Sequence, residues 1–175
     1  MSTLERIVTS HVGKFMLFAL FIVIVTLVQA SGQSAPHVQT IDAVGPRPLE
    51  KQTADKVSHF YLEAWKDLRT AFAENRPQAL DASFVGVARE KLAEAIRQQQ
   101  ALGMKTQYQD RGHDLKFVFY SSEGLSVQLL DTVDYDVQVI DHGHVVGTRH
   151  MHSRYVAVLT PTEVRWKVRF FQADL

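Results

Sequence analysis

Apolar and polar side chains alternate along residues 125–141, LSVQLLDTVDYDVQVID. A period of two is typical of a β-strand that buries one face. The apolar face carries Leu125, Val127, Leu129, Val133, Tyr135, Val137 and Val139. Asp131 interrupts this series, so we expect its carboxylate to point inward among the apolar side chains.

Three further strands are predicted around this one from the same alternation. They cover residues 115–120, 151–159 and 164–170. The turns between the four strands, at residues 122–124, 142–144 and 160–163, each contain Gly or Pro, which favour tight reversals of the chain. The four strands therefore form an antiparallel meander.

Two helical regions precede the strands. Apolar residues recur every three or four positions over residues 49–73 and again over residues 80–102. Helices followed by an antiparallel meander predict an α+β fold, in which the helices pack on one face of a curved four-stranded antiparallel sheet.

The turn lengths predict which residues face each other across the sheet. A three-residue turn at 142–144 sets Tyr135 opposite Met151 on the inner face. The outer face then pairs Asp134 with His152 and Asp136 with His150. These four side chains are of the types that zinc or a similar divalent ion binds. The alternative is a solvated face with ordinary cross-strand charge pairs, and we expect no metal or other cofactor.

A four-residue turn at 160–163 makes a second set of pairs. It sets Tyr155 opposite Val168, Ala157 opposite Trp166, and Arg154 opposite Arg169 on the outer face. Like charges directly opposite are unfavourable unless an acidic group from this chain, another protein or a lipid lies between them. The predicted interaction face comprises Arg154, Arg165, Lys167, Arg169, His150 and His152. A homodimer through the sheet is a further expectation.

The inward Asp131 is the candidate for chemistry. With Tyr135, Tyr155 and His113 as neighbours, it could act as a general base inside the fold. The alternatives are a β-bulge at this position or an Asp that bonds a helix end. The sequence has no nucleophile motif, phosphate loop or dinucleotide fingerprint, so we expect a protein that is not an enzyme.

An uncharged run, FMLFALFIVIVTLVQA, occupies residues 15–30. It is either a retained membrane anchor in the lipid bilayer or a signal peptide cleaved after Ala30. Arg6 and Lys14 precede the run, and the positive-inside rule then places the N-terminus in the cytoplasm. In a bacterium we expect a single-pass inner-membrane protein with a periplasmic C-terminal domain.

Three segments follow from this organisation: the anchor or signal at residues 1–30, an extended linker at 31–48 rich in Ser, Gly, Gln and Pro, and one domain at 49–175. The 19 basic residues balance the 19 acidic ones. A neutral chain lacks the electrostatic footprint of a nucleic-acid binder, so we expect no nucleic-acid partner. Cysteine is absent, which excludes disulfides and a lipidated cysteine.

A family resemblance rests mostly on core positions. These are Ala64-Trp65-Lys66, Leu92 and Ile96, the run from Val127 to Thr132, Tyr155, and Trp166-Lys167-Val168. They resemble the cone-shaped superfamily of nuclear transport factor 2 (NTF2-like) and SnoaL-like proteins, and within it the IMS-type domain of cyanobacterial and plastid division proteins. A tether before such a domain also resembles the inner-membrane assembly factors of type IV secretion.

The resemblance implies protein contacts. We therefore expect a non-catalytic, membrane-anchored accessory or assembly subunit of a larger inner-membrane complex, of a secretory, division, photosynthetic or respiratory kind. Its partners are then subunits of that complex. The alternative is a periplasmic ligand-binding or catalytic cone protein that uses Asp131.

Overall fold

The computed structural model describes residues 35–39 and 45–174. The predicted leader at residues 1–30 lies outside these ranges. Within them, none of the helices combines the length and the apolar character that crossing a membrane requires.

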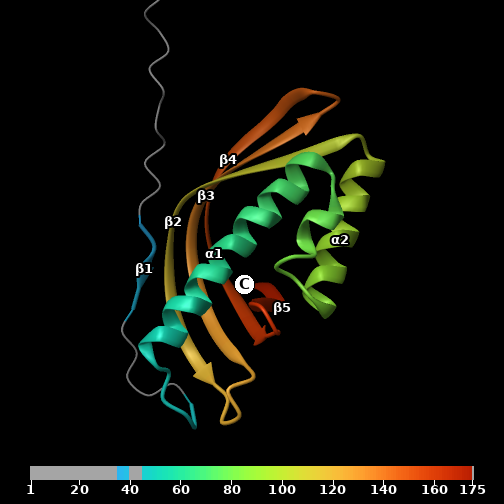
Figure 1. Cartoon of the computed structure of the whole chain (residues 1–175). Helices are drawn as coiled ribbons and strands as arrows, with labels where there is room; N and C mark the ends of the chain where they lie inside the picture. The colour runs from blue at the N-terminus through green and yellow to red at the C-terminus, as the bar shows by residue number, and fades with distance from the viewer. Residues whose placement is uncertain (1–34, 40–44, 175) are drawn as a thin grey trace, which may run out of the picture. The chain divides into compact units, whose positions relative to one another are not determined.

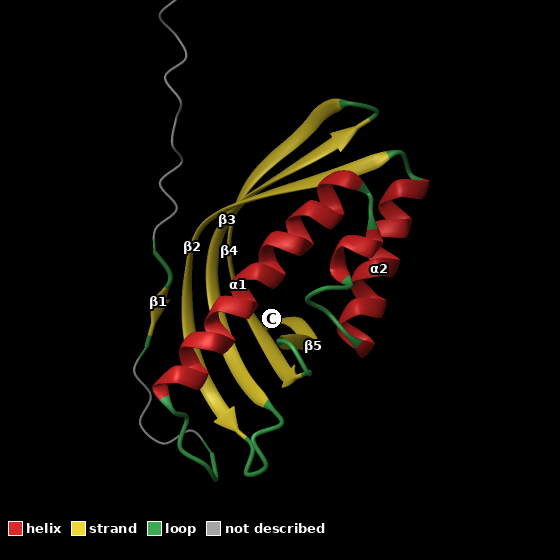
Figure 2. Ribbon diagram, viewed as in Figure 1, coloured by secondary structure: helices red, strands yellow, loops and turns green. Residues whose placement is uncertain are grey.

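The predicted α+β class is confirmed, with two helices packed on a five-stranded mixed sheet (Figures 1 and 2). The helices are α1 (Lys51–Glu74), the short 3-10 helix η1 (Pro77–Leu80) and α2 (Gly86–Ala101). The strands are β1 (His37–Val38), β2 (Met104–Tyr120), β3 (Val127–Asp141), β4 (His144–Pro161) and β5 (Trp166–Asp174). They lie side by side in chain order, and both helices cover the same face.

The sheet has one strand more than the sequence predicts. β1 lies in the segment expected to be an extended linker and pairs in parallel with β2, His37 with Asp114 and Val38 with Leu115. β2 also begins at Met104, well before the predicted start at residue 115. Its first part escaped prediction because most of its side chains are exposed or half-buried, so no apolar alternation marks it.

The core lies between α1 and the sheet. Val57, Tyr61, Trp65 and Leu68 recur at helical spacing along α1 and are buried against the sheet. The predicted strand residues Leu129 and Val133 are fully buried beneath them, together with other apolar residues of the sheet.

One buried amide links three elements. The Gln99 side chain on α2 donates to the Phe72 carbonyl of α1 at 2.8 Å and accepts from the Thr106 hydroxyl of β2 at 2.9 Å. Asn75, in the left-handed conformation that ends α1, donates to the Met104 carbonyl at 2.9 Å. These bonds fix both helix ends to the start of β2.

The predicted register between β3 and β4 is confirmed. Tyr135 faces Met151, Asp134 faces His152 and Asp136 faces His150. The turn itself is tighter than predicted, because Asp141 pairs with His144 and only His142 and Gly143, both with positive φ, lie between them. A bulge at Val139/Ile140 restores the register.

The predicted register between β4 and β5 is wrong. The structure pairs Tyr155 with Ala173, Ala157 with Phe171 and Arg154 with Asp174. The turn lies at residues 162–165, where the Thr162 amide donates to the Arg165 carbonyl at 2.8 Å. Val164 therefore belongs to the turn and is 87% exposed, although its apolar side chain resembled the first inward residue of the strand.

Candidate functional site

Asp131 points into the core, as its place in the alternation predicted. Pairing between β3 and β4 continues without a bulge across it, and its side chain is 0% exposed. One carboxylate oxygen, Oδ2, accepts from the Tyr61 hydroxyl on α1 and bonds His113 Nδ1 on β2, both at 2.9 Å. The other oxygen, Oδ1, has no hydrogen-bond partner among the described residues.

His113 extends this network toward the surface. Its Nε2 lies 3.7 Å from Asp110 Oδ2, which in turn lies 2.9 Å from Arg69 NH1 on α1. Burial alone would lower the pKa of His113, but its contacts with Asp110 and Asp131 raise the pKa from 6.5 to about 9. His113 is therefore an imidazolium at neutral pH, and opposite charges alternate from Asp131 to Arg69.

Tyr61 completes the network from the helix side. Burial and the Asp131 charge raise the pKa of its hydroxyl well above the ordinary value, so Tyr61 remains a hydrogen-bond donor at any physiological pH. Hydrogen bonds from Tyr61 on α1 and His113 on β2 hold the Asp131 carboxylate in place.

Aromatic rings fill the space beside Asp131. The Trp65 ring lies 5.3 Å from the His113 and Tyr155 rings and 5.5 Å from the Phe171 ring. The Tyr135 and Tyr155 hydroxyls bond each other at 2.9 Å, rather than Asp131. A cavity of about 260 Å³ reaches His113, Asp110 and Arg69, but Asp131 is not part of its wall.

The structure thus assembles only part of the predicted catalytic group. His113 contacts Asp131 directly. Tyr155 faces Asp131 across the strands, and Tyr135 is linked to Tyr155 through a hydrogen bond between their hydroxyls. Sequence reasoning missed Tyr61, Asp110 and Arg69. The signal for Tyr61 was available, because its hydroxyl sits in the apolar stripe of α1 and a buried hydroxyl needs a partner.

The outer face of the sheet holds the predicted acid and histidine ladder. His152 Nδ1 lies 2.6 Å from Asp134 Oδ1, and His150 Nδ1 lies 3.0 Å from Asp136 Oδ1. Arg111 donates to the same Asp136, and this contact lowers the pKa of the Asp136 carboxyl. Among the described residues no group of three or more His, Asp or Glu side chains is arranged to hold a metal ion.

The basic residues of the predicted interaction face do not share one surface. Arg165 lies 3.2 Å from Glu63 on α1, and Lys167 donates to the Asp81 carbonyl beyond η1, so both reach the helical layer. Arg154 bonds Asp174 at 2.6 Å, whereas Arg169 donates to Ser126. The predicted facing of Arg154 and Arg169 is wrong because the turn lies later in the chain and moves β5 along β4.

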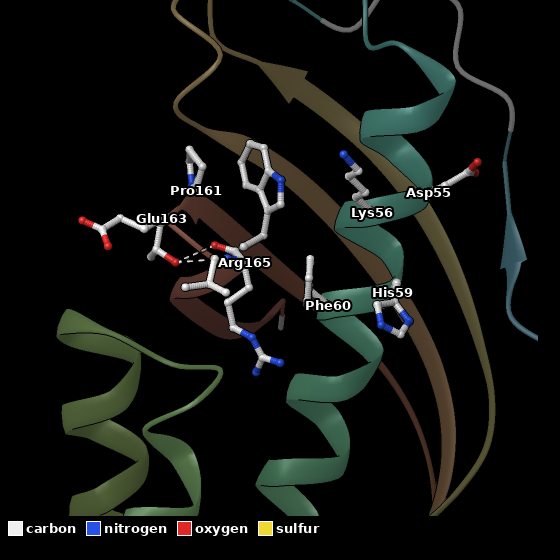
Figure 3. A pocket seen from close by; sticks show the side chains of 10 residues that line it. Asp55, Lys56, His59, Phe60, Pro161, Glu163 and Arg165 are labelled. Carbon is white, nitrogen blue, oxygen red and sulfur yellow. Dashed lines mark hydrogen bonds between the residues drawn. The ribbon is translucent and has the colours of Figure 1, made fainter.

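An open groove of about 500 Å³ lies between α1 and the turn that joins β4 to β5 (Figure 3). Asp55, Lys56, His59 and Phe60 of α1 form one wall, and residues 161–166 form the other. Phe60, Val164 and Trp166 make the groove largely apolar.

Charged groups border the groove. Arg165 is held over the Phe60 ring, 5.2 Å from its centroid, by its bond to Glu63. Lys56 on one wall and Glu163 on the other form no ion pair within the described residues. Among the described residues, the groove thus carries one unpaired cation and one unpaired anion beside its apolar side chains.

Comparisons with known proteins identify the fold. No family model matches the sequence, and no curated protein matches it either. Among solved structures, the intermembrane space region of the chloroplast protein ARC6 matches with a TM-score of 0.60 at 14% identity, over 73% of this chain and 98% of that one.

Two looser matches are a putative scytalone dehydratase from Novosphingobium aromaticivorans and a periplasmic fragment of TraM. The first has a TM-score of 0.48 at 12% identity, over 72% of this chain and 89% of that one. The second has a TM-score of 0.44 at 11% identity, over 69% and 96%. The match to the ARC6 region bears on the fold alone. The chain has the NTF2-like, cystatin-like cone fold that its core residues predicted.

Proposed function

We propose that this protein is a non-catalytic, single-pass membrane-anchored accessory or assembly subunit of a larger inner-membrane complex. Residues 15–30 form the anchor, and the cone domain lies outside the cytoplasm. The domain binds a subunit of that complex through the groove between α1 and the turn at residues 162–165.

The observation that carries this proposal is the contrast between the groove and the interior. Val164 in the groove is the most exposed large apolar side chain of the described residues, at 87%. The interior, by comparison, is filled by Trp65 and its aromatic neighbours. Accessible apolar surface is typical of a protein-binding site, whereas Asp131 lines neither the groove nor the cavity beside His113.

The proposed location of the domain outside the cytoplasm has support from one comparison. One solved structure with this fold is the intermembrane space region of a chloroplast protein, so the fold occurs in a domain that lies between membranes. The anchor also brings the groove close to other membrane proteins, which raises their effective concentration at the domain.

Site-specific photo-crosslinking in the full-length, membrane-extracted protein tests the groove. A crosslinker at Val164 is expected to capture one protein partner, and Lys56→Glu should reduce that yield because it reverses a charge on the rim. A crosslinker at Val87, which is also exposed but lies on α2, is the matched control. Equal capture at both positions would contradict the proposal that the partner binds in the groove. A mature soluble chain that begins at Ser31 would contradict the proposal that residues 15–30 are a retained anchor.

A catalytic or ligand-binding role for Asp131 is the second candidate. It is favoured by Asp131 Oδ1, a buried oxygen without a partner, which could accept a bond from a ligand. A thermal-shift screen of small hydrogen-bond donors on wild type and Asp131→Asn tests it. A compound that stabilises only the wild type would support this role, and an empty screen would favour the accessory subunit.

A further inference from the structure

Within the described residues, part of β4 has an unpaired edge. β3 pairs with β4 from His144 to Leu159, but β5 pairs with β4 only from Arg154 onward. On that side the preceding residues, 144–153, have no neighbouring strand within the described part of the chain. Figure 1 shows this part of β4 in the hairpin that projects past the C-terminal end of α1.

The edge is open to an added strand. Pairing with β3 runs without interruption from Gly147 to Ser153, and the only irregularity lies nearer the hairpin tip, at Val139/Ile140. Residues 144–150 are all exposed, and a Cβ at Gly147 would meet no atom within 4 Å. The edge sequence, HVVGTRHMHS, contains neither Pro nor Lys, two residues that often protect an edge strand from pairing.

The charge of the edge indicates the kind of strand that it accepts. Residues 144–153 contain Arg149 and three histidines but no Asp or Glu. Arg149 is exposed and forms no ion pair within the described residues. His150 and His152 face the other side of the sheet, where Asp136 and Asp134 of β3 already contact them. Among the described residues of this edge, Arg149 thus carries a charge without an ion-pair partner.

We propose that residues 147–153 of β4 bind an extended, acidic segment of a partner protein as an added strand. Main-chain hydrogen bonds supply the attraction, and an acidic side chain beside Arg149 supplies the selectivity. Two copies of this chain fit less well, because two antiparallel β4 edges would set His and Arg against His and Arg. This edge is separate from the groove, so the proposal does not rest on the proposed function.

Amide hydrogen exchange on the full chain in detergent tests the proposal. The probe is a synthetic peptide of alternating Glu and Val residues, compared with a Lys and Val peptide and with a Glu peptide whose valines are replaced by Pro. Only the first is expected to slow exchange, at alternate amides of residues 147–153. Arg149→Glu should weaken its binding about tenfold, because an attraction becomes a repulsion across the strands.

Lys105→Glu is the matched control, since Lys105 lies on β2, two strands away from the edge, and the same charge change there should alter binding less than twofold. Equal binding of the Lys and Val peptide would overturn the proposal, as would protection at the groove instead of the edge. Protection that appears without peptide and grows with protein concentration would assign the edge to a second copy and also overturn it.

Discussion

The two faces of β3 carry the same chemistry in different surroundings. Asp131 on the inner face meets His113 at 2.9 Å, and Asp134 on the outer face meets His152 at 2.6 Å. The Asp131 side chain is 0% exposed, whereas that of Asp134 is 48% exposed. Water screens the outer pair, while the inner pair has replaced water by fixed partners. The comparison predicts that the loss of one partner from an Asp–His pair costs more free energy of unfolding where the pair is buried, whatever the distance between the two side chains.

The largest expected effect comes from breaking the inner pair. Asp131→Ala leaves the His113 imidazolium buried beside Asp110 alone, and should lower the free energy of unfolding by about 3–5 kcal/mol. Asp134→Ala on the same strand should cost no more than about 1 kcal/mol. Urea unfolding of both variants measures the difference. Similar losses for the two variants would mean that burial does not separate the two faces.

A pH titration sharpens the same comparison. Unfolded histidine releases its proton near pH 6.5, whereas folded His113 holds it until about pH 9. Its contribution is therefore complete below about pH 6.5 and is lost as the pH rises through 9, by about 3 kcal/mol in total. Chemical unfolding between pH 6 and 10 checks this. The decline should persist in His152→Gln and disappear in His113→Gln, and a decline in both would assign it to other groups.

The smallest effect concerns the outer pair of Arg154 and Asp174, which are 2.6 Å apart and both partly exposed. A double-mutant cycle with alanine at both positions should give a coupling of about 0.5 kcal/mol. The same cycle with Arg154 and Arg169 should give no coupling, because the structure does not place these two residues opposite each other. Coupling of Arg154 to Arg169 instead would restore the register predicted from the sequence.

The sequence predicted the elements that bury one face. β3 and the inward Asp131 followed from strict alternation, and the helices followed from their apolar stripes. The predicted facing of Asp134 and His152 was also correct, although the turn is shorter than expected and a bulge compensates for it. Burial leaves a periodic trace in the sequence, so these features could be predicted.

The features without such a trace were missed. The first part of β2 has mostly polar side chains, and β1 is two residues held by pairing alone. Val164 caused the opposite error, because it was predicted to begin the last strand but lies exposed in the turn. In the sequence, an exposed valine in a turn cannot be distinguished from a buried valine in a strand. The groove depends on that same turn, so the sequence could not place it.

β1 brings the start of the folded domain closer, along the chain, to the predicted anchor. Pairing with β2 begins at His37, well before residue 48, where the predicted linker ends. The chain from Ala30 to His37 reaches at most about 25 Å even when fully extended. If residues 15–30 are the anchor, two residues of parallel pairing set the greatest length of chain between the membrane and the first strand.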